Sequence, residues 1–389
     1  MERQPLISVA HVIHHLVIGG MENGVVNLIN RLPRDRFRHA VFCIEDYSEF
    51  RERIKVPGVE VHALHRSQIG VTRLRWQLFK LFRKWRPDIV HSRNLSGLDA
   101  LLPARLAGAA TLHSEHGFDV DNLDGKGRKQ ALLRRLHAPL VKHFVTVSEH
   151  LRQTLVEFQR VDPTRVTHIC NGVDTTVFAP APVPAYGHLL PPAFCNGECF
   201  VVGTVGRARP IKDQLTLVRA VGRLIHDDPG MARHLRLVVV GEGPMLTALK
   251  DEARQLGIGE LTWFPGARHD VATLMQNLDL FVLPSLNEGI SNTMLEAMST
   301  GIPTLATAVG GNVELIKPGE TGATFQPGDV AGLAALLARY VADRAMSSQQ
   351  GVAAREHVLR NFSLQTMMAG YQDVYETLKA DHVRHRRDI

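Results

Sequence analysis

Short apolar runs alternate with longer amphipathic stretches along most of the chain. The runs are rich in Val and Ile, as in HFVTVS, CFVVGTVGR and LRLVVVGEG, and each ends at a glycine or a polar turn before a stretch with helical spacing. Runs that are apolar on both faces are typical of strands buried in a parallel sheet between helices. The pattern therefore predicts an α/β protein with parallel sheets.

The predicted strands fall into two groups separated by a proline-rich segment. Strands of the first group are predicted at residues 7–13, 39–44, 60–63, 88–92, 110–113 and 143–147, with a helix at about 22–31. Strands of the second group are predicted at residues 200–205, 235–240, 261–264, 279–283 and 303–307. With 389 residues the chain is too long for one typical domain, and it suffices for two with sizeable cores.

The segment between the two groups, APAPVPAYGHLLPPAFCNGEC, carries five prolines and little periodicity, so it predicts an extended connector. We therefore predict a first domain at 1–175, a linker at 176–198 and a second domain at 199–362, followed by a terminal helix within 363–389. Ligands of open parallel sheets bind beyond the carboxyl ends of the strands, so two such domains are expected to form a cleft where these edges face each other.

Two carboxylates, Glu288 and Glu296, lie around the start of a helix that is predicted at residues 292–299. Ser291 or Asn292 is suited to cap this helix. The orphan N–H groups and the positive dipole end of a helix attract phosphate, and Gly289 has no side chain to block a close approach. Glu296 lies about 6 Å further along the axis at 1.5 Å per residue. A pyrophosphate at the helix start could therefore leave its ribose at Glu296 and its sugar at Glu288.

The pattern E, seven residues, E, followed by AM-x-TGIP and a GGN-E element, resembles the donor-site signature of the retaining glycosyltransferases with the GT-B fold, often called glycosyltransferase family 4. The resemblance implies two Rossmann-like, doubly wound domains that face a central cleft, with the terminal helix crossing back onto the first domain. It also implies transfer of a hexose-type sugar from a UDP- or GDP-linked donor, with retention, to a glycan or polyprenyl-linked acceptor. The whole chain is similar to bacterial transferases of exopolysaccharide or lipid-linked glycan synthesis, including those associated with exosortase-type systems.

Two cations in CFVVGTVGRARPIKDQ, Arg207 and Lys212, straddle the entry to a predicted helix and could converge on one pyrophosphate. The resemblance implies that they hold the diphosphate and stabilise the charge on this leaving group, so neither a divalent metal nor a cofactor is expected. It also implies that Glu296 binds ribose hydroxyls and Glu288 orients the sugar. Further phosphate contacts are expected from the backbone N–H groups of Ile290, Ser291 and Asn292, beside Gly289 in the donor site.

Two mechanisms fit these residues. In a front-face reaction the departing phosphate oxygen helps to take the acceptor proton, and no protein base is needed. Alternatively, Glu288 is a covalent nucleophile, and a glycosyl adduct on it should then be detectable.

The first predicted strand-to-helix turn, VIGGMENG, contains Gly19 and Gly20, whose backbone could approach a phosphate closely. The matching turn of the family faces the donor, so both glycines are candidate donor contacts. Glu22 is explained by its place in the first turn of a helix, where the helix dipole favours an acid.

A second loop of the first domain, ATLHSEHGFDVDN, resembles the family loop in which a histidine points at the transferred sugar. His116, which a glycine follows, matches better than His113. A neutral imidazole can donate or accept a hydrogen bond to a hydroxyl, so His116 is a candidate catalytic residue. Asp119 and Asp121 form a D-x-D, as in metal-dependent transferases of the other major fold, but the adjacent histidine loop favours the metal-free interpretation.

Two turns of the second domain follow predicted strands. Gly241 and Gly243 begin a dinucleotide fingerprint, but Leu246 replaces the third glycine, which disfavours a nicotinamide enzyme. The turn WFPGARHDV resembles the family turn near the nucleotide base, so Pro265 and Gly266 are predicted to line the base pocket.

Positive charge is concentrated in the first domain. Residues 1–175 contain 26 Lys plus Arg against 18 Asp plus Glu, a net of +8, and the rest of the chain has 19 against 21. Much of the excess lies at residues 72–87, TRLRWQLFKLFRKWRP, where a leucine-rich face is flanked by basic residues. A crossover helix packed on the sheet explains the stripe equally well, but Trp76 and Phe79 lie outside it and favour contact with an anionic membrane. No motif for nucleic acid accompanies the charge.

The remaining composition favours a cytoplasmic protein, at most peripheral at the inner face of the plasma membrane. The four cysteines are few, as in reduced compartments, and no run approaches the roughly 18 apolar residues of a membrane span. The apolar start of the chain lacks a cleavage-site pattern and predicts a strand. Cys195 and Cys199 lack further ligands nearby and are interpreted as ordinary thiols.

Two other functions share these features. A GT-B nucleotide-sugar epimerase or phosphorylase has the same fold, and an epimerase would convert UDP-N-acetylglucosamine with no acceptor. A non-catalytic subunit that binds sugar nucleotides or polysaccharide would also show the domain pattern. The presence of both acids and both cations favours a catalyst over such a subunit.

Overall fold

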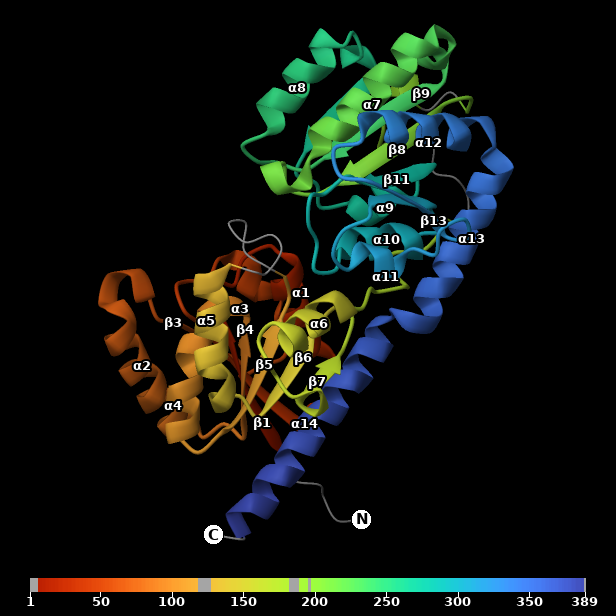
Figure 1. Ribbon diagram of the computed structural model, residues 1–389. Coiled ribbons are helices and arrows are strands. Elements are labelled where there is room, and N and C mark those ends of the chain that lie inside the picture. Colours follow the sequence, from red (N-terminus) through yellow and green to blue (C-terminus); the bar gives the residue numbers. More distant parts are fainter. Residues whose placement is uncertain (1–5, 118–126, 182–188, 195–196, 388–389) are drawn as a thin grey trace. The chain divides into compact units, whose positions relative to one another are not determined.

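The computed structural model describes residues 6–117, 127–181, 189–194 and 197–387 (Figure 1). The chain forms two compact units, Met1–Asn171 with Gln365–Ile389, and Gly172–Leu364. Each unit contains one fully parallel sheet covered by helices, so the predicted fold class, two Rossmann-like domains, is confirmed.

The sheet of the first unit has the strand order β3-β2-β1-β4-β5-β6-β7. Its strands are β1 (Ile7–Ile13), β2 (Phe37–Cys43), β3 (Glu60–Ala63), β4 (Ile89–Arg93), β5 (Ala110–Glu115), β6 (His143–Thr146) and β7 (Val166–His168). The order reverses between β1 and β4, so the carboxyl ends of β1, β4 and β5 form the topological switch point at which ligands of such sheets bind.

Helices cover this sheet and supply its core. They are α1 (Gly20–Arg31), α2 (Arg66–Trp85), α3 (Asn94–Gly97), α4 (Leu101–Leu106), α5 (Arg128–His137), α6 (Glu149–Glu157) and α14 (Leu364–Arg387). The leucine-rich face of α2 packs inward, because Leu74, Leu78 and Phe82 are fully buried against Phe42 and Val90. Each such side chain contributes about 1.5–3 kcal/mol by burial.

The sheet of the second unit has the order β10-β9-β8-β11-β12-β13. Its strands are β8 (Phe200–Val205), β9 (Leu235–Val240), β10 (Thr262–Gly266), β11 (Leu280–Leu283), β12 (Thr304–Thr307) and β13 (Gly322–Phe325). Its helices are α7 (Gln214–Asp227), α8 (Leu246–Gln255), α9 (Val271–Met275), α10 (Asn292–Ser299), α11 (Asn312–Leu315), α12 (Val330–Ala342) and α13 (Arg344–Asn361). The switch point lies between β8 and β11.

The long terminal helix α14 belongs to the first unit from Gln365 onward. Tyr375 is fully buried, and its hydroxyl lies 2.8 Å from Nδ1 of His91 in β4. Lys379 forms an ion pair with Asp88 at the start of the same strand. Helix α14, at the end of the sequence, thus contributes to the core of the unit that begins with β1. In the described part of the chain, no helix combines the length and the apolar character needed to cross a bilayer.

The described start of the predicted linker, at Phe178 and Ala179, is hydrogen-bonded to the second unit. The carbonyl of Phe178 accepts a hydrogen bond from Ser299 Oγ at 2.6 Å, and that of Ala179 accepts one from Gln276 Nε2 at 2.8 Å. Both donors lie in the second unit, which begins at Gly172 rather than after a separate linker. Prolines remove backbone donors but leave carbonyls free to accept, so a proline-rich segment can bind along a folded domain.

All the predicted strands are present, and their observed ends differ from the predicted ones by no more than two residues. Two further strands, β7 and β13, were not predicted, because RVTHIC and GATF are short and lack a run of Val and Ile. β5 extends to Glu115, beyond the predicted end at residue 113.

Candidate active site

The second unit joins a cation and an acid from the ends of two neighbouring strands. Lys212 lies in the turn after β8, Glu288 lies in the loop after β11, and Lys212 Nζ is 2.5 Å from Glu288 Oε1. Ser285 Oγ donates to the same oxygen at 2.7 Å. The sequence assigned Lys212 to the diphosphate and Glu288 to the sugar, and the structure places both groups in direct contact. A phosphate bound at Lys212 would therefore lie beside Glu288.

Two glycines support the loop that carries Glu288. A Cβ atom at Gly310 would lie 1.8 Å from the carbonyl oxygen of Glu288, and one at Gly311 would lie 2.0 Å from that of Gly289. Gly311 N–H donates to the Glu288 carbonyl at 3.1 Å, and Gly310 has a positive φ of 50°. No side chain fits between these two backbone segments. The GGN element at residues 310–312 was recognised in the sequence only as part of the family signature. In the structure its two glycines hold the loop that carries Glu288 in position.

The predicted helix over residues 292–299 is confirmed as α10, and Ser291 caps it by accepting a hydrogen bond from Met294 N–H at 3.3 Å. Ile290 and Ser291 are buried, which fixes the backbone at the helix start. Glu296 follows one turn later and is only partly exposed. Burial raises the pKa of its carboxyl to about 8, and no described residue hydrogen-bonds to that group. A buried acid without a partner is suited to accept hydrogen bonds from ligand hydroxyls.

Arg207 occupies the turn directly after β8. It is exposed, and its guanidinium makes no hydrogen bond or ion pair to a described residue. Its carbonyl accepts from Gln214 Nε2 at 3.3 Å, and Leu286 N–H donates to Ile211 O at 2.8 Å, which links this turn to the loop after β11. The guanidinium is therefore available to an anion, on a backbone that is held in place.

The G-x-G turn after β9 packs against the same segment. A Cβ atom at Gly241 would lie 2.0 Å from Gly206 O, and one at Gly243 would lie 2.4 Å from Ala208 O. These glycines thus serve close backbone packing, in agreement with a structural turn. Pro265 and Gly266 end the edge strand β10, where Gly266 O accepts from Gly241 N–H at 2.9 Å.

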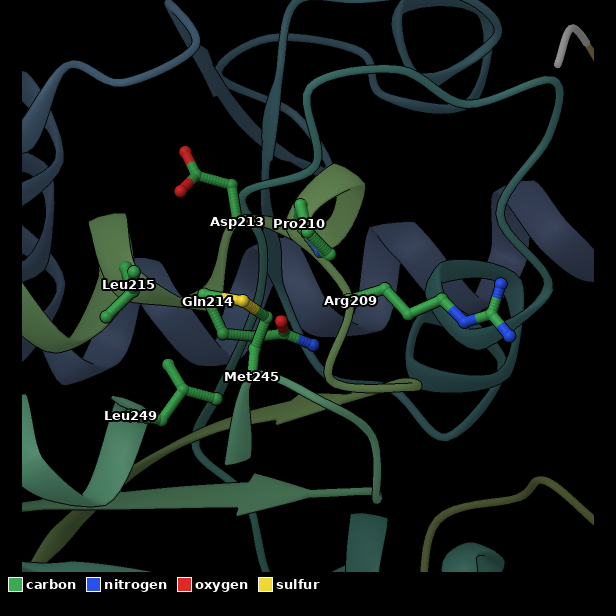
Figure 2. Close-up of a pocket in the computed structure, with 7 residues that line it drawn as sticks. All are labelled: Arg209, Pro210, Asp213, Gln214, Leu215, Met245 and Leu249. Atoms are coloured by element: carbon green, nitrogen blue, oxygen red, sulfur yellow. The ribbon is translucent and has the colours of Figure 1, made fainter. Parts of the chain in front are cut away.

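A small pocket of about 210 Å³ lies on the other side of this turn, toward α8 (Figure 2). Arg209, Pro210 and Asp213 form one wall, and Met245 and Leu249 form the opposite one. Neither Arg207 nor the ion pair at Glu288 lines it, so this pocket is separate from the predicted donor residues.

In the first unit, Gly19 is the N-cap of α1 and Gly20 is its first residue. A Cβ atom at Gly19 would lie 2.2 Å from Glu22 Oε2, so the Glu22 carboxylate folds back over the helix start. An acid at this position compensates the orphan N–H groups of the helix. The Glu22 carboxylate thus occupies the space next to Gly19 at the start of α1.

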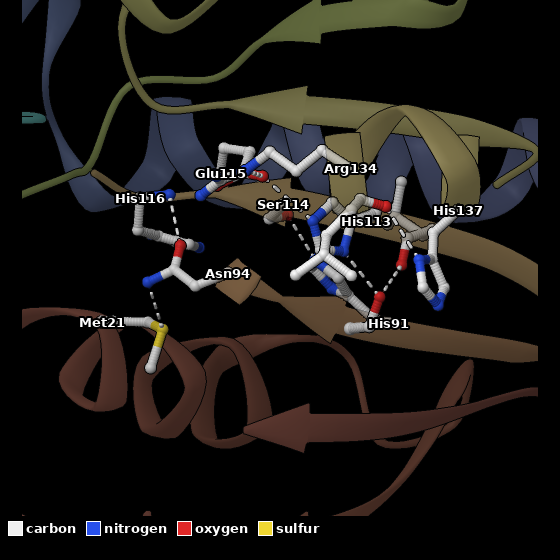
Figure 3. A network of polar contacts seen from close by, with 12 residues as sticks. Met21, His91, Asn94, His113, Ser114, Glu115, His116, Arg134 and His137 are labelled. Carbon is white, nitrogen blue, oxygen red and sulfur yellow. Dashed lines mark hydrogen bonds and ion pairs between the residues drawn. The ribbon is translucent and has the colours of Figure 1, made fainter. Parts of the chain in front are cut away.

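His116 lies just beyond the end of β5, and its backbone N–H donates to Asn94 Oδ1 at 2.8 Å (Figure 3). Both ring nitrogens are buried and have no partner among the described residues. Burial and, next, the nearby Arg93 guanidinium lower the pKa of His116 to about 3, so its imidazole is neutral. His113, in contrast, is bound by Ser92 Oγ at 2.8 Å and by Glu115 Oε1 at 3.3 Å. The structure thus leaves His116, rather than His113, with unused hydrogen-bonding capacity.

Beneath His116 lies a buried polar network that the sequence analysis missed. Arg93 is only 1% exposed, and its Nη2 is 3.2 Å from His11 Nδ1 and 3.1 Å from His91 Nδ1. His91 Nε2 in turn lies 2.5 Å from Ser114 Oγ (Figure 3). The available signal was the run of consecutive polar residues that ends PDIVHSRN and ATLHSEH, which breaks the pattern of a strand apolar on both faces.

A second buried pair stabilises the same strand end. Glu115 Oε1 is 2.7 Å from Arg134 Nε, and both side chains are buried. Although burial acts to raise the pKa of Glu115, the Arg134 guanidinium and His113 lower it to about 2. Removing either partner would leave a buried charge, so α5 is attached to β5 by a strong constraint.

Two further predictions concerned a D-x-D pair and a pair of cysteines. Asp119, Asp121 and Cys195 lie outside the described residues. Cys199 is buried, and its thiol donates to Ala193 O. Within the described ranges, no group of three or more His, Cys, Asp and Glu side chains could hold a metal ion.

Two parallel-sheet units, with acidic and basic side chains gathered at their strand ends, define the GT-B class of glycosyltransferases. The family model described as Glycosyltransferase Family 4 matches residues 18–177, and the model described as Glycosyl transferases group 1 matches residues 199–343. The chain belongs to this glycosyltransferase family and is an enzyme of that class. The resemblance read from the donor-site signature is thereby confirmed.

Similar proteins agree with this assignment. The chain is 26% identical to the UDP-Gal:alpha-D-GlcNAc-diphosphoundecaprenol alpha-1,3-galactosyltransferase of Escherichia coli, over 95% of this chain and 96% of that protein. It is 33% identical to the D-inositol 3-phosphate glycosyltransferase of Stackebrandtia nassauensis, over 70% of this chain and 64% of that protein. The crystal structure of Anabaena HepE with UDP and glucose superposes with a TM-score of 0.81 at 20% identity, over 96% of this chain and all of that chain, which shows the shared fold.

Glu296→Gln is expected to remove a pH-dependent loss of stability. The carboxyl has a pKa of about 8 in the folded protein and 4.5 ordinarily, so the folded state binds more protons between these values and its stability falls as pH rises through them. Gln carries no charge, so at pH 8.5 the variant should melt at a higher temperature than the wild type, by about 2–4 °C for each kcal/mol of unfolding free energy recovered. At pH 5 the two proteins should melt at the same temperature.

The exposed α13 residue Glu356 provides the control, and Glu356→Gln should leave the pH dependence unchanged. Thermal melts at pH 5, 7 and 8.5 measure the effect. Parallel melting curves for the wild type and Glu296→Gln across this range would show that Glu296 titrates normally.

Proposed function

We propose that the enzyme transfers a hexose-type sugar from a nucleotide diphosphate sugar to a glycan or lipid-linked acceptor in bacterial polysaccharide synthesis, with retention and without a metal. One observation carries the proposal: Glu288, which is paired with Lys212, lies four residues before the first residue of α10, and the unpartnered Glu296 follows one turn into that helix. Lys212 and the N–H groups at the helix start are suited to the diphosphate, with Glu288 available to the sugar at one end of it and Glu296 to the ribose at the other.

The similar proteins favour a UDP-linked donor over a GDP-linked one. The Escherichia coli relative is named for UDP-Gal and for an acceptor that carries a diphosphoundecaprenol group, and the HepE structure holds UDP and glucose. We therefore propose UDP-sugar as the donor and a polyprenyl diphosphate-linked sugar as the acceptor.

In the proposed reaction, Arg207 and Lys212 bind the diphosphate and stabilise the charge that develops as the bond between C1 of the sugar and the phosphate oxygen breaks. The acceptor hydroxyl forms a new bond to C1 on the same face, and its proton goes to the departing phosphate oxygen. Glu288 orients the sugar hydroxyls, while its contact with Lys212 places this carboxylate next to the phosphate. The neutral His116 exchanges a hydrogen bond with a sugar hydroxyl.

Gly310→Ala and Gly311→Ala variants would displace the loop, so Glu288→Gln is the cleaner test of the acid. This variant keeps the size of the side chain and one acceptor oxygen but removes the charge paired with Lys212. We expect kcat to fall on the order of 100-fold, the scale of one electrostatic contact in a transition state, with a smaller change in the donor KM.

Turnover of UDP-sugar with a lipid-linked acceptor measures this change, and mass spectrometry of the trapped enzyme distinguishes the two mechanisms. A glycosyl adduct on Glu288 would replace the front-face reaction by a double displacement. Unchanged kcat in Glu288→Gln would remove Glu288 from the catalytic site.

Arg207→Ala is expected to weaken UDP binding by about 1.5–3 kcal/mol, the scale of a charge-assisted hydrogen bond. Arg209→Ala is the matched control, because Arg209 is an exposed arginine two residues away that lines the separate pocket of Figure 2. Titration calorimetry with UDP should show about a tenfold or larger loss for the first variant and little change for the second. Equal losses in both would indicate a general charge effect, against a specific phosphate contact.

We also propose that the outer face of α2 contacts anionic lipid, at the inner face of the plasma membrane. Trp76 is 56% exposed, its ring stacks on Phe79 with centroids 5.7 Å apart, and Lys80 Nζ lies 5.1 Å from its ring. The helix α4, which packs against α2, exposes Leu102 and Leu106. Aromatic and aliphatic side chains beside basic residues are typical of surfaces that insert into a lipid headgroup region.

The double substitution Trp76→Ser with Leu106→Ser should reduce binding to phosphatidylglycerol vesicles by about 10-fold or more, since each side chain contributes about 1.5–3 kcal/mol when buried. Leu359→Ser, at an exposed leucine of α13, is the matched control and should bind as the wild type does. Vesicle co-sedimentation at low and high salt measures the effect. Equal binding by all three proteins would contradict a lipid-contacting face on α2 and α4.

A further inference from the structure

A pocket of about 610 Å³ opens within the first unit at the carboxyl ends of β1 and β4. His14, which follows β1, and Asn94, which follows β4, lie in its wall, together with side chains of α2 and α5. The pocket lies at the switch point of the sheet, where ligands of parallel sheets bind. All its lining residues belong to the first unit, so it is distinct from the donor residues of the second.

The pocket lies beside His116. Asn94 has a left-handed backbone with φ of 50°, and its Oδ1 accepts from the His116 N–H at 2.8 Å. The other end of the Asn94 amide points to Met21, which also lines the pocket (Figure 3). A ligand here would therefore lie within reach of the histidine proposed to contact the transferred sugar.

One wall of the pocket carries excess positive charge. Arg66 and Arg75 both contact a single carboxylate, that of Asp99, at 3.4 and 2.9 Å. The two arginine side chains are each 37% exposed, whereas that of Asp99 is 13% exposed, so the cations are the more accessible partners. Two guanidinium groups with one carboxylate leave a net charge of about +1, which favours an anionic ligand.

Two nitrogen atoms in this wall lack hydrogen-bond partners. Arg75 Nε and His14 Nδ1 are both buried, and neither is paired with any described residue. A buried donor without an acceptor is rare in folded proteins. Arg75 Nε is a donor, and His14 Nδ1 is one in the tautomer that carries the proton there, so both atoms point to a ligand that completes the wall. Phosphate oxygens fit both, because they accept several hydrogen bonds and match the fork of an arginine.

Part of the pocket lining is apolar. Leu95, Leu98 and Leu133 line the pocket, and α5 continues outward from Leu133 with exposed Leu132 and Leu136, the latter 64% exposed. Exposed leucines on consecutive turns of a helix give a continuous path for an aliphatic chain. A ligand that fits both the charged and the apolar lining has an anionic head and an aliphatic tail.

We propose that this pocket binds the diphosphate of an amphiphilic, lipid-linked acceptor, with its oxygens on Arg75, Arg66 and His14, and its first aliphatic units on Leu95, Leu98 and Leu133. The proposal rests on the proposed function and deepens it, because it assigns the part of the enzyme that selects the acceptor. The acceptor sugar, attached to the other end of the diphosphate, then extends toward His116.

Binding of farnesyl diphosphate to the whole protein in the presence of saturating UDP tests the pocket, because UDP keeps the donor residues occupied. The variant Arg75→Gln keeps the length of the side chain and removes its charge. Arg73→Gln is the matched control, since Arg73 is exposed on the same helix and does not line the pocket. We expect Kd to rise at least tenfold in Arg75→Gln and to stay unchanged in Arg73→Gln.

A second variant tests the apolar wall and guards against misfolding of the first. Leu133→Asp changes a partly exposed position and should also raise the Kd of farnesyl diphosphate at least tenfold. In the wild type, inorganic pyrophosphate and farnesol should each bind at least tenfold more weakly than farnesyl diphosphate. Thermal melts of each variant with UDP alone report whether the second unit remains intact.

Three results would overturn the proposal: an unchanged Kd in Arg75→Gln, pyrophosphate binding as tightly as farnesyl diphosphate, or farnesol binding as tightly. The second would define a site for free phosphate and the third a purely apolar site. Failure of the proposed function is separate, since it would show as no binding of UDP to the wild type while farnesyl diphosphate still distinguishes Arg75→Gln from Arg73→Gln.

Discussion

The contact between the backbones of Gly310–Gly311 and Glu288–Gly289 is the constraint on which the donor residues depend. A side chain at either glycine would lie about 2 Å from a carbonyl oxygen, so no other residue allows this approach. The contact fixes Glu288 beside Lys212 and places the start of α10 after it, with the Ser291 cap in position. The arrangement of the proposed donor residues is therefore built on backbone packing, and the positions of the charged side chains follow from it.

The first unit meets a different problem, since it buries a guanidinium among imidazoles. Arg93 lies between His11 and His91, and the hydroxyl of Tyr375 in the terminal helix contacts the same nitrogen of His91, Nδ1, as Arg93 does. Burial and, next, the charge of Arg93 lower the pKa of His91. Buried polar groups of this kind are tolerated only when a network satisfies them, which ties the last helix of the chain to the first strands. At the edge of this network His116 remains neutral and unpartnered, as Glu296 does in the second unit. Both units thus hold dehydrated polar atoms where a ligand is expected.

Much of the architecture could be predicted because strand-forming runs of Val and Ile and their glycine turns are local signals. The strands at 200–205 and 235–240, and the helix at 292–299, were predicted to the residue. The short strands β7 and β13 were not, because their pairing partners, rather than their own residues, make them strands. The buried Arg93 network was missed for a related reason: the polar runs at the ends of β4 and β5 are visible in the sequence, but no local pattern shows that these side chains are buried and satisfy one another.

The sequence by itself determined the fold class, the family and the identity of the residues around Glu288 and Glu296, because these depend on periodicity and on a motif contiguous in the chain. Only the tertiary structure decided what those residues contact. Lys212 and Glu288 are 2.5 Å apart although they are far apart in sequence, and Arg66 and Arg75 share one carboxylate, so that a pocket with excess positive charge remains. Parallel strands bring distant loops to one edge of a sheet, and the partners found there depend on packing that no local pattern encodes.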